Sequence, residues 1–178
     1  MQAKKLGIVF LAVLILGAVV VGQQAAPAAS TAAASSEKDA LLLIAPRHDL
    51  WRLAPAELKA MPHTTVTIHN SHTNADETYS GVRVADLLAK MNAPLGGDLR
   101  GEALANYVIA TGLDGYQAVL ALAEVDPSFH PGEVLVADAM DGKPLDVHSG
   151  PLRLVVTEDK RPARSVRNLV SIELKSAK

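Results

Sequence analysis

The chain of 178 residues contains no cysteine. Disulfide bonds, thiolate metal sites, iron–sulfur clusters, cysteine nucleophiles and a lipidated cysteine are therefore excluded by chemistry. The sequence also contains no glycine-rich phosphate loop, no Gly-x-Ser-x-Gly motif and no His-Glu-x-x-His motif. Nucleotide-binding and hydrolase functions consequently have no motif to support them.

The chain has almost no net charge, since 17 Lys and Arg stand against 19 Asp and Glu, for a formal net charge of -2. No long basic run offsets this balance locally. Nucleic-acid binding ordinarily depends on a broad positive surface that neutralises phosphates. We therefore expect no nucleic-acid partner.

The N-terminal segment has the pattern of an export signal. Lys4 and Lys5 precede an uninterrupted run of apolar or small residues, Leu6–Gly22, and this order is typical of a secretory signal. The run approaches the length of about 20 residues that spans a bilayer. Residues 1–22 are predicted to be a signal peptide or an N-terminal membrane anchor. We expect a periplasmic protein, soluble after cleavage or tethered to the membrane by this segment alone.

Composition divides the remainder of the chain into a linker and one domain. Residues 23–37 are Ala, Ser, Thr, Gln and Pro with a single Glu, and such a segment cannot bury enough apolar surface to offset the entropy of ordering. We predict a flexible linker there. Residues 38–178 are predicted to form one domain of ordinary size.

Hydrophobic spacing within this domain predicts several strands and two helices. Val84, Leu87, Leu88 and Met91 follow helical spacing and predict a helix over 82–92. A shorter helix is predicted over 55–61, and the polar residues 69–78 are predicted to form a loop. Short apolar runs predict strands at 41–44, 65–68, 107–110, 116–122, 134–137, 152–157 and 169–174. This mixture favours an α+β fold.

Five segments carry a family resemblance. They are Leu53–Pro62, Tyr79–Leu88, Asp114–Val119, Gly150–Val156 and Arg164–Arg167. In this order and spacing they resemble the oxidoreductase molybdopterin-binding domain, the core fold of the sulfite oxidase family. The resemblance implies a mixed, barrel-like β-sheet fold with short helices, and it makes molybdopterin a possible cofactor.

The chain departs from that family at the metal ligand. In catalytic members a cysteine thiolate that binds molybdenum follows the strand that corresponds to 65–68, whereas this chain reads Ile68-His-Asn-Ser-His72 there. The usual bond to the metal cannot form. A serine oxygen such as that of Ser71 is a conceivable substitute ligand. Sulfite-oxidase-type catalysis is therefore not expected of this polypeptide alone.

His69 and His72 are the candidate metal ligands, with Asp76 and Glu77 nearby in the sequence. Imidazole and carboxylate groups together suit zinc, copper or iron. The alternative interpretation is a solvated polar loop without a metal, because a His-x-x-His spacing alone does not make a closed site.

A basic segment near the C-terminus is the candidate anion site. Guanidinium groups suit phosphate, sulfate or carboxylate, and the segment contains Arg153, Lys160, Arg161, Arg164 and Arg167. Two alternatives stay open: a solvated turn, or an arginine that pairs with Asp114 and holds the fold. The set predicted to bind a cofactor or an anion is Arg153, Arg164, Arg167, Ser71 and Tyr116.

These observations predict an exported domain that is a degenerate ligand-binding or redox-associated accessory protein. The expected partners are a small anion or pterin-type ligand and a redox protein. One alternative is a molybdopterin-dependent oxidoreductase whose metal is held without cysteine. Another is a metal-handling periplasmic protein that uses His69 and His72.

Overall fold

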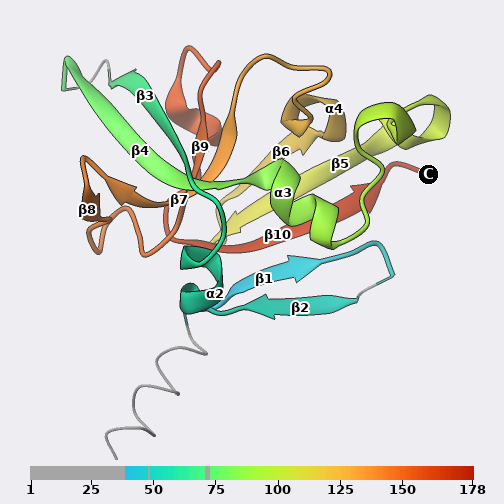
Figure 1. Cartoon of the computed structure of the whole chain (residues 1–178), viewed down its shortest axis with the longest axis horizontal. Helices are drawn as coiled ribbons and strands as arrows, with labels where there is room; N and C mark the ends of the chain where they lie inside the picture. The colour runs from blue at the N-terminus through green and yellow to red at the C-terminus, as the bar shows by residue number, and fades with distance from the viewer. Residues whose placement is uncertain (1–38, 48, 71–72) are drawn as a thin grey trace, which may run out of the picture.

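The computed structural model describes residues 39–47, 49–70 and 73–178. The predicted signal or anchor, 1–22, and the predicted linker, 23–37, lie outside the described residues. Within the described part of the chain, two five-stranded sheets are accompanied by a few short helices (Figure 1). The predicted α+β class is confirmed, and the sheets do not close into a barrel over those residues. None of the described helices is long and apolar enough to cross a membrane.

The first sheet has the strand order β2-β1-β10-β5-β6. Its strands are β1 (Leu41–Ile44), β2 (Leu50–Leu53), β5 (Asn106–Gly112), β6 (Gln117–Ala121) and β10 (Leu169–Ser176). β1 and β10 are parallel, and the other neighbours are antiparallel. Buried and exposed residues alternate strictly along β6, as expected of a strand with one face on the core.

The second sheet contains β3 (Thr64–Asn70), β4 (Ala75–Arg83), β7 (Val134–Met140), β8 (Lys143–Pro144) and β9 (Arg153–Val156). The order is β3-β4-β7-β8, and β9 also pairs with β7. All four residues of β9 are buried, because the strand is covered on both faces. Arg153, the first residue of β9, is one of the few buried charged residues of the described chain.

The helices are α2 (Pro55–Lys59), α3 (Val84–Lys90), α4 (Leu122–Val125) and the 3₁₀ turns η1 (Gly96–Asp98), η2 (Gly101–Ala105) and η3 (Pro162–Arg164). α3 confirms the predicted helix and buries the apolar stripe that predicted it. It begins two residues later than expected because Val82 and Arg83 pair with β7 as the end of β4.

The predicted loop over 69–78 is wrong. β3 continues to Asn70, and β4 begins at Ala75, so that His69 lies opposite Asp76 in an antiparallel ribbon (Figure 1). The segment is polar because one face of this ribbon meets solvent, while alternate residues such as Ile68 and Glu77 face inward. Backbone pairing across the ribbon, which needs no apolar side chains, decides its conformation.

Candidate functional site

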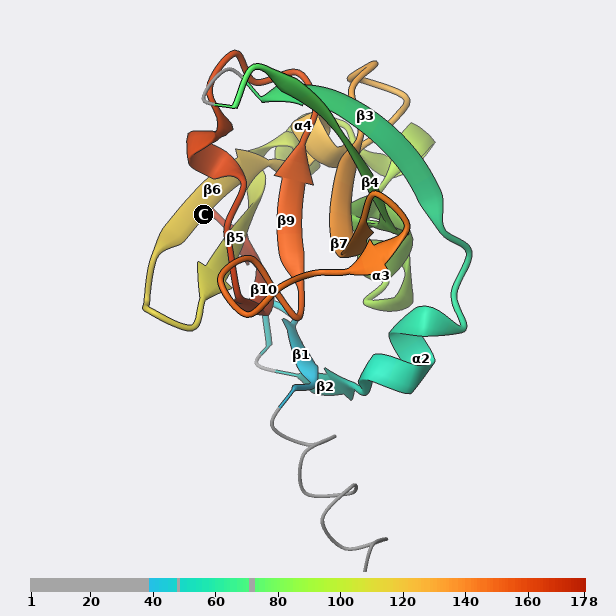
Figure 2. The same cartoon turned by 90° about the vertical axis from the view of Figure 1, so that its left-hand side faces the viewer.

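One face of the molecule gathers the predicted anion-binding residues. Figure 2 shows this face, with β9 near its centre, the β3–β4 ribbon above it, and the β5–β6 hairpin and η3 beside it. Two adjoining cavities open here. The ribbon cavity, of about 650 Å³, lies under the β3–β4 ribbon, and the hairpin cavity, of about 690 Å³, lies beside the β5–β6 hairpin. Arg153, Pro162 and Arg167 line both.

Arg153 is the central residue of this site. Its side chain comes from the start of β9, and the residue is only 8% exposed. Nη1 donates a hydrogen bond of 2.7 Å to the Tyr79 hydroxyl, and the guanidinium carbon lies 5.2 Å from the centre of the Tyr79 ring. Nε is buried and has no hydrogen-bond partner among the described residues. A buried donor without a partner costs about 1–3 kcal/mol, which makes Arg153 costly to keep for stability alone.

Tyr79 holds Arg153 in place, and Glu77 in turn holds Tyr79. The Tyr79 hydroxyl accepts from Arg153 and donates to Glu77 Oε2 at 2.7 Å, while Asn70 Nδ2 donates to Glu77 Oε1 at 2.6 Å. Burial and the hydrogen bond to Glu77 raise the pKa of Tyr79 to about 12, against the lowering effect of Arg153 and Arg167. Tyr79 is therefore neutral at physiological pH and fixes the guanidinium by hydrogen bonding rather than by charge.

The carboxylates of the ribbon cavity are already engaged by donors of the protein. Glu77 accepts from Tyr79 and Asn70 as described. Asp146 Oδ1 accepts from the backbone N–H groups of His148 and Ser149 at 3.0 and 2.8 Å. The third carboxylate, Asp159, is held by an arginine outside the cavity.

The cations of the ribbon cavity are, in contrast, largely uncompensated. Lys160 and Arg167 are exposed, and over the described chain neither side chain has a hydrogen bond or an ion pair. Among the described residues, Arg153 hydrogen-bonds only the neutral Tyr79 hydroxyl. Three cations of the cavity, Arg153, Lys160 and Arg167, stand against two carboxylates, Glu77 and Asp146, that pair with no cation in the described chain, and this positive balance suits an anion.

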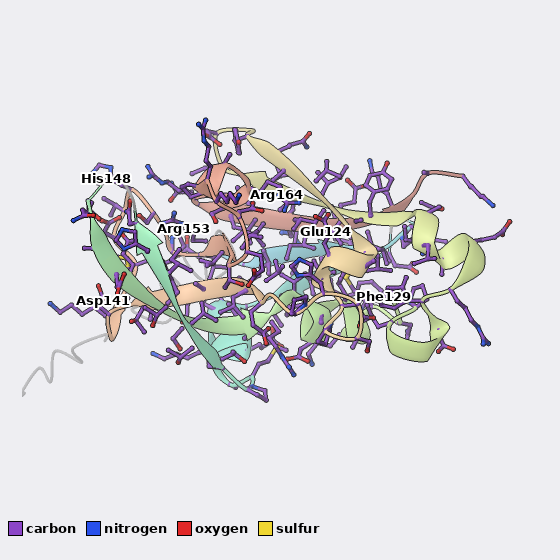
Figure 3. All side chains as sticks on the ribbon, turned by 90° about the horizontal axis from the view of Figure 1, so that it is seen from above. Glu124, Phe129, Asp141, His148, Arg153 and Arg164 are labelled. Carbon is purple, nitrogen blue, oxygen red and sulfur yellow. The ribbon has the colours of Figure 1, made fainter. Side chains whose placement is uncertain are left out.

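Arg164 is a structural residue and not part of this site. It donates to Asp159 through Nε and Nη2 at 2.9 and 2.6 Å, and to Glu124 through Nη1 at 2.8 Å. Figure 3 shows Arg164 and Glu124 side by side. The sequence left open whether an arginine would bind ligand or hold the fold. Arg164 holds the fold, and its partners are Asp159 and Glu124 rather than Asp114.

These contacts shift the pKa values of both Arg164 and Glu124. The hydrogen bonds to Asp159 and Glu124 raise the pKa of Arg164. Burial opposes ionisation of Glu124, but the hydrogen bonds from Arg164 and from the Ala121 backbone N–H outweigh it and hold the pKa of Glu124 below its ordinary value.

Replacing Arg164 with glutamine is expected to lower the free energy of unfolding by about 1–2 kcal/mol, a modest figure because solvent screens a side chain that is 34% exposed. Since the pKa of Glu124 is lowered by folding, its stabilisation is present above the ordinary pKa of 4.5 and is lost as the pH falls through the folded value. Urea denaturation of the unmodified chain and of Arg164→Gln at pH 7 and pH 3 measures this loss of stability. A loss that is the same at both pH values would contradict the ion-pair account.

Tyr116 and Arg167 lie beside the same cavity. Tyr116 is half exposed directly before β6, at the end of the turn that joins β5 and β6, and its hydroxyl donates to the Ala163 carbonyl at 2.7 Å. Both residues line the hairpin cavity with Arg153. The structure thus brings three of the predicted residues together. Ser71, the remaining predicted residue besides Arg164, lies outside the described residues.

The candidate metal ligands are not brought to a metal centre within the described residues. His69 Nδ1 contacts Asp76 Oδ1 at 2.8 Å, and both side chains are exposed. In the part of the chain that the structure describes, no group of three or more His, Cys, Asp or Glu residues could hold a metal ion. His72 lies outside the described residues, so that the predicted metal site stays a prediction.

Several site residues carried no sequence signal. Ser149, Ser165 and Asn168 line the cavities, but each lies in a turn or loop where polar residues are ordinary. Tyr79 is fully buried and also donates a hydrogen bond to Glu77. Its partnership with Arg153 joins two different strands and has no local pattern.

Comparison with known proteins places the described fold. Residues 50–178 match the family model described as the oxidoreductase molybdopterin binding domain. No curated protein sequence matches the chain. A similar solved structure is the sulfane dehydrogenase SoxCD from Paracoccus pantotrophus, with a TM-score of 0.59 and 17% sequence identity over 79% of this chain. The match covers 39% of the SoxCD chain, and at this identity it shows the shared fold alone.

Proposed function

Because the chain belongs to the oxidoreductase molybdopterin-binding domain family and contains no cysteine, we propose that it uses the family fold to bind a small anion without a molybdenum–thiolate centre. The ligand is an oxyanion or the phosphate of a pterin-type molecule. The observation that carries this proposal is the buried Arg153, whose Nε lacks a partner and whose guanidinium has no ion pair among the described residues.

The side chains of the site suit one part of a molybdopterin cofactor, its phosphate group, and do not suit the other part, its metal. Arg153, Lys160 and Arg167 have the positive donors that a phosphate group requires. No side chain of this polypeptide can supply a thiolate to a metal. The residues therefore fit a phosphate and do not fit the thiolate-bound metal of a sulfite-oxidase-type centre.

The proposed place of action is the periplasm. The pattern of residues 1–22 supports export, with the domain either released or tethered after the linker. In this compartment the domain serves as a ligand-binding or redox-associated accessory protein.

The test begins with the full chain purified from the cells that naturally make it. Inductively coupled plasma mass spectrometry measures molybdenum, zinc, copper and iron, and pterin is measured by fluorescence after oxidation. Thermal unfolding is then followed against sulfate and phosphate, with chloride at equal ionic strength as the control. We expect no stoichiometric molybdenum and a saturable rise in Tm with sulfate or phosphate, since ligand at 100 times Kd stabilises the fold by about 2.7 kcal/mol.

Two results would overturn the proposal. Stoichiometric molybdenum and pterin would establish the second candidate, an oxidoreductase with a non-cysteine ligand, which family membership favours. A Tm that responds equally to chloride and to the oxyanions would show that the cavity has no anion site. Stoichiometric zinc, copper or iron would instead direct attention to a metal-handling role for His69 and His72.

A further inference from the structure

Two large apolar side chains that line the hairpin cavity are exposed, and a third exposed apolar residue is next in sequence to a lining residue. Leu113 is 77% exposed, Tyr116 is 50% exposed, and Val147, beside the lining residue His148, is 85% exposed. Figure 2 shows the hairpin and the loop that leads into β9 on the same face of the molecule. Scattered exposed apolar residues are ordinary on a protein surface, but several around one cavity indicate an interaction site.

Backbone and side-chain hydrogen bonds to Asn168 hold this rim in place. The Leu113 N–H donates to the Asn168 carbonyl at 2.9 Å, and Asn168 Nδ2 donates to the His148 carbonyl at 3.2 Å. The Asn168 N–H also donates to the Ser149 carbonyl at 3.1 Å. The two apolar loops are therefore tied to one residue, and a binding surface made from them is organised before a partner arrives.

The centre of this apolar rim is positively charged. Arg167 lines the cavity and has no ion pair among the residues that the structure describes, and Arg153 lies behind it. Asp114 is also present, but its Oδ1 accepts the Tyr116 backbone N–H at 3.0 Å. An inorganic oxyanion would satisfy the arginines but would gain nothing from exposed leucine and valine. A peptide with an acidic side chain between apolar side chains would satisfy both.

We propose that the hairpin cavity docks a segment of a partner protein in which an acidic residue stands between apolar residues. The carboxylate pairs with Arg167, and the apolar neighbours pack on Leu113, Tyr116 and Val147. The hairpin cavity shares Arg153, Pro162 and Arg167 with the ribbon cavity. Leu113 and Tyr116 line the hairpin cavity and not the ribbon cavity, so the apolar contacts of the docked segment do not depend on anion binding.

The experiment pans a phage-displayed library of random peptides against the full chain and measures the enriched peptides by fluorescence anisotropy. We expect enrichment of peptides with Asp or Glu flanked by aliphatic or aromatic residues. Leu113→Ser and Arg167→Gln are each expected to weaken binding about tenfold or more, as removal of an interface anchor does. Phe129→Ser is the matched control, because Phe129 is 50% exposed but lies well apart from His148, toward the other side of the molecule (Figure 3).

Sulfate titration of Leu113→Ser separates this proposal from the proposed function, because Leu113 lines the hairpin cavity and not the ribbon cavity. Leu113→Ser is expected to keep the sulfate-dependent rise in Tm while it loses peptide binding. The docking proposal is overturned if no peptide is enriched, if the enriched peptides are basic or wholly apolar, or if Phe129→Ser weakens binding as much as Leu113→Ser. Loss of the sulfate effect in the unmodified chain, with peptide binding intact, would overturn the anion site alone.

Discussion

Replacing Gly81 with alanine is expected to lower the free energy of unfolding by about 3 kcal/mol or more, at the upper end of overpacking effects. A Cβ atom at this position would lie 2.2 Å from the Val136 carbonyl oxygen and 2.5 Å from the Ala137 Cα. Both are backbone atoms of β7 and cannot rotate away. Gly81 stands where the register between β4 and β7 shifts, so that the methyl group would separate the two strands.

Urea denaturation measured by circular dichroism checks this value. Gly97→Ala is the matched control, because Gly97 is exposed and a Cβ atom added there would meet no heavy atom within 4 Å beyond its chain neighbours; the change there is expected to stay within about 0.5 kcal/mol. Tyr79 lies two residues before Gly81 on β4, and therefore Gly81→Ala is also expected to weaken sulfate binding. Equal stability of the two variants would show that β4 and β7 tolerate a wider spacing.

Replacing Arg153 with methionine is expected to abolish the sulfate- or phosphate-dependent rise in Tm without a cost to the ligand-free fold. Burial of a charge carries a desolvation penalty of several kcal/mol, and an apolar side chain of similar volume does not carry it. The substitution also removes the buried Nε that has no partner in the described chain. Tyr79 would keep its hydrogen bond to Glu77.

Thermal unfolding of Arg153→Met with and without sulfate measures both effects. Arg83→Gln is the contrasting variant, since Arg83 and its ion-pair partner Asp86 line neither cavity; it should keep the response to sulfate. If Arg153→Met proved strongly destabilising and still responded to sulfate, Arg153 would be a structural residue and the anion site would lie elsewhere.

Local pattern was sufficient for much of the fold. The helical spacing of Val84, Leu87 and Leu88 places all three in the buried stripe of α3, and most of the apolar runs became strands. The hydrophobic pattern did not predict the strands within residues 69–78 or the strand β2, whose first three residues are exposed. Hydrophobic periodicity reports which residues are buried. β2 is instead stabilised by backbone pairing with β1, and β3 and β4 are stabilised by backbone pairing with each other. Such pairing leaves no periodic pattern in the sequence.

The sequence alone determined which chemistry is unavailable, because a chain without cysteine can form no thiolate bond to molybdenum whatever its fold. It also placed the basic residues in one segment. Only the tertiary structure decided their roles: Arg164 meets Glu124, 40 residues away, while Arg153 meets Tyr79, 74 residues away. Partners at such separations are set by strand register and sheet order. For that reason, neighbouring arginines of similar sequence context became a structural ion pair and a candidate anion site.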